Sequence, residues 1–77
     1  MFTNESINVI LGVNGKDQVY GFAIQGGAQP VVVKYEDIDT RLGYVMLTVN
    51  KENRVYVNYD AISAIVVQPK PKNQPKG

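Results

Sequence analysis

The 77-residue sequence contains no cysteine, no histidine and no tryptophan. Without cysteine the chain can form no disulfide. Without cysteine and histidine it also lacks the usual zinc ligands, every thiol nucleophile and the imidazole general base. A chain of this length is expected to fold as one domain with a small core. We therefore expect a non-enzymatic protein that binds no metal or cofactor and that gains further stability by association.

Long hydrophobic runs and a strongly basic domain are also missing. The apolar runs are far shorter than the about 20 residues that span a bilayer, and the first residues, MFTNES, do not resemble a signal peptide. These features predict a soluble, cytoplasmic protein with no membrane partner. Three of the eight basic residues are Lys70, Lys72 and Lys76, which leaves five basic and seven acidic residues in 1–68. The domain is thus expected to be mildly acidic, unlike a typical phosphate-backbone binder.

The chain divides into a domain over residues 1–68 and a Pro/Lys tail over residues 69–77. Proline fixes φ and removes backbone donors, and the tail contains no large apolar residue, so it is predicted to be disordered. Its lysines could tether RNA or an acidic partner, or they could serve only to keep the chain soluble.

The domain is rich in Val, Ile, Tyr and Thr, which favour strands. Asn14-Gly15 predicts a tight turn after the first strand, Gly21 predicts a bulge or bend, and residues 51–53 predict a hairpin connection. At the amino end, residues 3–6 could cap one short helical turn. The candidate strands are SINVILG (6–12), QVYGFAI (18–24), VVVKYE (31–36), YVMLTVN (44–50), RVYVNY (54–59) and AISAIVV (61–67).

Five or six short strands predict an all-β fold, a small and strongly bent barrel of the SH3-like type. The last two strands follow each other with almost no turn, and Tyr59-Asp60 lies at their junction. A barrel needs an abrupt corner where a strand passes from one sheet edge to the other. We expect Tyr59-Asp60 to form this corner as one tight helical turn.

Several short motifs resemble the Sm-like family and its bacterial RNA-chaperone (Hfq) branch. Residues 57–66, VNYDAISAIV, resemble the second conserved segment of that branch. Residues 7–11 with Asn14-Gly15-Lys16 resemble its first strand and turn, and residues 38–46 resemble its loop and following strand. The resemblance implies an Sm-like barrel that pairs RVYVNY of one copy with AISAIVV of the next in a cyclic homo-oligomer and binds single-stranded RNA.

The sequence departs from the family pattern at two places. Residues 22–38 exceed the family's length and are expected to form an inserted, protruding hairpin that could contact a protein partner. Gly43 stands where the family has a base-contacting Asn, and Tyr59-Asp60 stands where the bacterial branch has Lys-His. The alternative is therefore a structural or protein-interaction module of the SH3-like barrel type that binds no RNA.

Five residues are the candidate ligand contacts: Asp39, Arg41, Tyr44, Tyr59 and Asp60. An aromatic ring such as that of Tyr59 can stack on any base, and Arg41 can bind phosphate or stack. The structural alternative is that Tyr59 packs across a subunit interface, Asp60 caps the following turn, and Asp39 accepts hydrogen bonds from its own loop. The sequence leaves both interpretations open.

Overall fold

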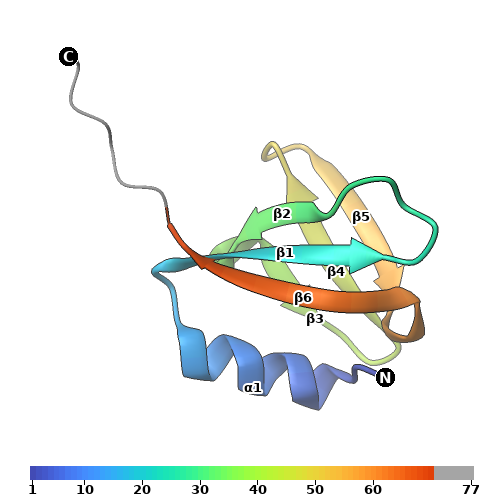
Figure 1. Ribbon diagram of the computed structural model, residues 1–77, viewed down its shortest axis with the longest axis horizontal. Coiled ribbons are helices and arrows are strands. Elements are labelled where there is room, and N and C mark those ends of the chain that lie inside the picture. Colours follow the sequence, from blue (N-terminus) through green and yellow to red (C-terminus); the bar gives the residue numbers. More distant parts are fainter. Residues whose placement is uncertain (71–77) are drawn as a thin grey trace.

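The computed structural model describes residues 1–70, which form one helix, six strands and two short 3-10 turns (Figure 1). The prediction of a β-rich fold is confirmed, but the all-β barrel is not, because a helix precedes the strands and the strands within residues 1–70 form two separate sheets. No helix among these residues is long and apolar enough to cross a membrane. In chain order the elements are α1 (Asn4–Asn14), β1 (Gln18–Ile24), β2 (Val31–Lys34), η1 (Tyr35–Asp37), β3 (Ile38–Thr40), β4 (Tyr44–Val49), β5 (Asn53–Asn58), η2 (Tyr59–Ala61) and β6 (Ile62–Pro69).

The six strands form two three-stranded antiparallel sheets, in the orders β2-β1-β6 and β3-β4-β5. β1 lies in the middle of the first sheet, with Tyr20 opposite Val33 on one side and Val67 on the other. β4 lies in the middle of the second, where Met46 stands opposite Asp39 and Tyr56. The remaining four strands, β2, β6, β3 and β5, are therefore sheet edges.

Two corners carry the chain from one sheet to the other. η1 joins β2 to β3, and η2 joins β5 to β6, each within three residues. The prediction of a tight helical turn at Tyr59-Asp60 is thus confirmed. The backbone is extended on both sides of η2, at Asn58 and at Ile62, so the turn redirects a strand and leaves its extended conformation intact.

The strand predicted over residues 6–12 is wrong, because this segment belongs to α1. Thr3 and Ser6 form a reciprocal capping box at its start, and Gly15, with φ of 82°, ends it by donating its N–H to the carbonyl of Leu11. Ile7 and Leu11, one helical turn apart, face the core, whereas Val9 between them is exposed. Asn14-Gly15 therefore marks a helix end instead of a hairpin turn.

Residues 22–38 do not form a protruding hairpin. They comprise the end of β1, the exposed loop 25–30, β2 and η1, and both Phe22 and Val33 are buried in the core. The expected extra length counted residues 6–12 as the first strand, and these residues lie in α1. Gly21 lies in regular pairing with Val32 and Val66, and the register shifts further along, between Ala23 and Ile24.

The core lies between the two sheets and α1. Thr40 on β3 donates a hydrogen bond of 2.8 Å to the side-chain oxygen of Asn8, which ties the helix to the second sheet. Pro69, predicted to open the tail, is the last residue of β6, and residues 71–77 of the predicted tail lie outside the described residues. The buried hydrophobic residues are Ile7, Leu11, Tyr20, Phe22, Val33, Val45, Leu47, Val57, Tyr59 and Ile62.

Candidate binding sites

Tyr59 and Asp60, adjacent in η2, have opposite environments. The Tyr59 side chain is 8% exposed, and its hydroxyl donates a hydrogen bond to the backbone carbonyl of Arg41. Burial raises the pKa of Tyr59 above its usual value. Its ring belongs to the core of its own chain, which leaves little surface for a base to stack on. Asp60 is exposed, and no side-chain hydrogen bond caps η2.

The loop 41–43 brings three of the predicted residues together. The Arg41 guanidinium lies 2.8 Å from the Asp39 carboxylate, and this hydrogen bond raises the pKa of Arg41. The Arg41 backbone N–H donates to the carbonyl of Tyr44 at 2.9 Å, which closes the loop, and Gly43 has φ of 88°. Asp39 therefore accepts from a guanidinium, not from the backbone N–H groups of its loop as the structural alternative supposed.

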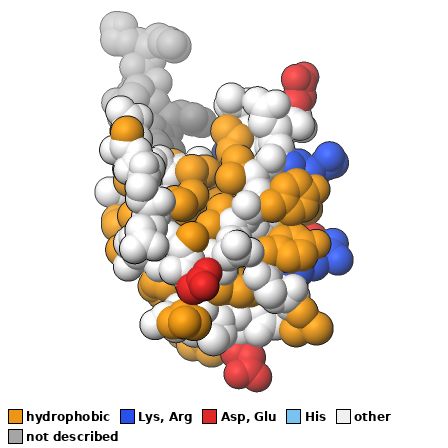
Figure 2. Space-filling model, turned by 90° about the vertical axis from the view of Figure 1, so that its right-hand side faces the viewer, with side chains coloured by type: hydrophobic (Ala, Val, Ile, Leu, Met, Phe, Trp, Pro, Cys, Tyr) orange, Lys and Arg blue, Asp and Glu red, His pale blue; other side chains and the backbone are white. Residues whose placement is uncertain are grey.

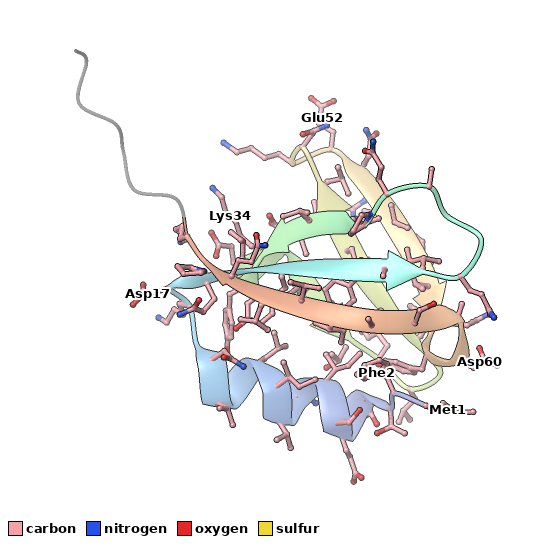
Figure 3. All side chains as sticks on the ribbon, in the orientation of Figure 1. Met1, Phe2, Asp17, Lys34, Glu52 and Asp60 are labelled. Atoms are coloured by element: carbon pink, nitrogen blue, oxygen red, sulfur yellow. The ribbon has the colours of Figure 1, made fainter. Side chains whose placement is uncertain are left out.

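A hollow of about 430 Å³ lies beside η2, and we call it the corner pocket. Figure 3 shows Met1, Phe2 and Asp60 at this end of the molecule, opposite the end that carries Asp17. Asp60 is the one charged side chain in the lining, and its carboxylate can accept hydrogen bonds from a ligand. The lining residues are Met1, Phe2, Thr3, Asn4, Gly43, Asn58, Tyr59 and Asp60.

Tyr44 belongs to a different surface, the outer face of the β3-β4-β5 sheet. Its ring centroid lies 5.7 Å from that of Tyr56, with 51° between the ring planes. Tyr44 is 37% exposed and Tyr56 is 62% exposed. Tyr56 is not among the five candidate residues, although its outward direction is visible in the sequence: residues 54, 56 and 58 alternate with the inward-facing Val55 and Val57.

A second hollow, of about 580 Å³, lies at the end of the β4-β5 hairpin, and we call it the lysine groove. Lys34, Lys51 and Lys70 line it around a valine floor, with Asp37 as the one carboxylate and no aromatic ring. The hairpin turn presents Lys51 because Asn50 and Lys51 both have positive φ, at 59° and 66°. No cluster of His, Cys, Asp and Glu that could hold a metal occurs within residues 1–70.

The five predicted residues therefore lie on two neighbouring surfaces that share the loop 41–43. Asp60 and part of Tyr59 line the corner pocket, whereas Arg41, Asp39 and Tyr44 lie on or beside the outer sheet face. Comparison of the chain with protein-family models, with curated proteins and with solved structures found no match.

Proposed function

We propose that this chain is an Sm-like small-barrel protein whose copies pair β5 of one subunit with β6 of the next in a closed ring, and that the ring is a cytoplasmic, non-enzymatic scaffold that binds single-stranded RNA. The observation that carries the proposal is the placement of these two strands. Each is paired on one side only, and η2 alone separates them in the chain.

The free edge of β6 can be described residue by residue. The N–H of Lys70 donates to the carbonyl of Asp17, which precedes β1. The backbone N–H and C=O groups of every second residue before it, Gln68 and Val66, therefore also face β1. Those of the alternate residues, Ile65 and Val67, point away from β1. Pro69, which has no N–H, falls on this outward set, as expected for an edge. An edge strand that carries no charged side chain from Ile62 to Val67 is a template for pairing with another copy.

Pairing of β5 with β6 of another copy joins two different surfaces. Repeating such a contact generates a closed ring when the rotation between neighbouring subunits brings the last copy back to the first. The resemblance in residues 57–66 supports the same pair of strands. It also implies single-stranded RNA as the ligand class, but the corner pocket carries Tyr59 and Asp60 in place of the family's Lys-His pair, so a basic contact to RNA must come from another surface.

Native mass spectrometry at two protein concentrations tests the assembly. We expect a single closed oligomer of the 8.5 kDa chain. Ala64→Lys places a charge on the exposed part of β6 without removing a core side chain, and we expect it to shift the mass towards the monomer. The matched control is Val13→Lys, on the exposed side of α1, which should leave the mass unchanged. A monomeric wild-type protein at micromolar concentration would contradict the assembly.

The second candidate is a protein-interaction module that contacts its partner through residues 22–38. The observation that favours it is the exposed Val32 on the edge strand β2, which lies in the lining of the lysine groove. This alternative predicts a monomer that binds no RNA oligonucleotide at low salt. The same mass measurement, combined with a binding assay, therefore separates the two candidates.

A further inference from the structure

We infer that the outer face of the β3-β4-β5 sheet is a stacking surface for single-stranded nucleic acid, formed by Tyr44, Met46 and Tyr56 between Arg41 and Arg54. This inference rests on the proposed function for its ligand class and assigns that ligand to a surface outside the corner pocket. Figure 2 shows hydrophobic side chains beside Lys and Arg side chains along the right-hand margin of the molecule.

Strand register places these side chains together. Met46 stands opposite Tyr56, Tyr44 opposite Asn58, and Thr48 opposite Arg54. Tyr44 and Tyr56 are thus diagonal neighbours on adjacent strands, which lie about 4.8 Å apart. Arg54 follows one pleat beyond Tyr56, at about 6.7 Å along β5. The result is an apolar strip with Arg54 following Tyr56 along β5, and with the Arg41–Asp39 ion pair beside it because Asp39 stands opposite Met46.

The two tyrosine rings are available to a ligand. They meet at 51° instead of stacking on each other, and Tyr56 has most of its surface exposed. A cross-strand aromatic pair alone would account for their contact. It does not account for the two arginines. Bases stack on aromatic rings whatever their sequence, and guanidinium groups bind the adjoining phosphates.

Charge favours nucleic acid over a protein partner on this face. The Arg41–Asp39 contact is the one ion pair within residues 1–70, so no carboxylate there pairs with Arg54. Arg41 uses one nitrogen on Asp39 and retains other donors. The face carries a net positive charge on a domain that is otherwise mildly acidic. Neither hollow offers the same combination, since the corner pocket has no basic side chain and the lysine groove has no aromatic ring.

The test is the binding of fluorescently labelled uridine and adenosine RNA oligomers of about 12 nucleotides, measured by anisotropy at two salt concentrations. Tyr56→Ala should weaken binding about tenfold, and Tyr56→Phe, which keeps the ring, should stay within about twofold of the wild type. Arg54→Gln should weaken binding and reduce the salt slope by about one. The matched control is Lys16→Gln, which removes an exposed charge outside this face and should change binding less than Arg54→Gln.

Chemical-shift mapping of the wild-type protein keeps the test decisive if a variant folds poorly. We expect shifts on addition of oligomer at Arg41, Tyr44, Met46, Arg54 and Tyr56. Shifts confined to the corner pocket, or a Tyr56→Ala protein that binds as well as the wild type, would overturn the inference while leaving RNA as the ligand. A ring of the expected mass that binds no oligomer at low salt would overturn the stacking surface and leave the proposed assembly unaffected. That result would favour a protein partner on this face.

Discussion

Substitution of Ile7 by alanine tests the docking of α1, the element that sequence patterns predicted wrongly. The Ile7 side chain is 1% exposed and belongs to the core between helix and sheets. Its truncation removes buried methyl and methylene groups and leaves a cavity, which costs about 2–5 kcal/mol in comparable cores. A single core of this size supplies about 3–5 kcal/mol of net stability. We therefore expect Ile7→Ala to lose most of its stability at 25 °C.

The matched control is Val9→Ala. Val9 is 63% exposed in the helix, so its truncation should change the free energy of unfolding by less than about 0.5 kcal/mol. Alanine is also the better helix former, which could make the change slightly favourable. In a strand, residues 7, 9 and 11 would share one face, and the two substitutions would have similar effects. The pair of variants therefore distinguishes a helix from a strand.

The assay is urea unfolding followed by far-ultraviolet circular dichroism. Each variant must be compared at the same protein concentration, because assembly adds to the apparent stability. A change of 1 kcal/mol corresponds to about 4–8 °C in the thermal midpoint of a domain of this size. A Val9→Ala protein destabilised as strongly as Ile7→Ala, or an Ile7→Ala protein with an unchanged midpoint, would refute the packing of α1.

Three further outcomes follow from the environments of named side chains. Tyr59→Phe leaves the Arg41 carbonyl without its partner and should lower the free energy of unfolding in urea by about 1 kcal/mol. An unchanged free energy of unfolding would contradict the anchoring of the loop by this hydrogen bond. Thr3→Ala removes the cap of α1 and should cost about 1 kcal/mol with a loss of helical signal, whereas an unaltered spectrum and midpoint would exclude the capping box. Burial raises the pKa of Tyr20 and Tyr59 above 10.0, so the unfolded chain loses these protons first and stability falls as the pH rises above about 10. Midpoints at about pH 8 and pH 11 should differ less in Tyr20→Phe than in the wild type, and equal differences would count against this origin.

Strands β4 and β5 could be predicted from the sequence because their side chains alternate between the two faces of the sheet. Val55 and Val57 face inward while Arg54 and Tyr56 face outward, which is the period of a half-buried strand. The helix could not be predicted in the same way. Val9 and Val13 are exposed and Gly12 lies in its last turn, so its apolar residues do not form one stripe. The available signal was the cap, Thr3 and Ser6, which has serine where the usual capping box has Glu or Gln.

The candidate site was predictable only in part, because its parts meet through contacts far apart in the chain. Arg41 and Asp39 are close in sequence, and their ion pair follows from the short loop. The contact between Tyr59 and Arg41 spans the two ends of the β4-β5 hairpin and depends on the closure of that hairpin. Tyr56 was recognisable as outward-facing. Its proximity to Tyr44 required the register, in which Tyr44 stands opposite Asn58.

At the junction of β5 and β6, two adjacent residues have different environments: Tyr59 is buried in the core and Asp60 is exposed. Tyr59 turns inward, completes the core and ties η2 to the loop 41–43, so its replacement must affect the corner and the loop together. Asp60 turns outward without a hydrogen bond from its side chain within residues 1–70, so its replacement should leave the corner intact. The loop that Tyr59 holds also positions Arg41 beside Tyr44. The Tyr59 hydroxyl therefore links the corner between the proposed pairing strands to one end of the proposed stacking surface. A change in Tyr59 should alter assembly and RNA binding together. A change in Tyr56 should alter RNA binding alone.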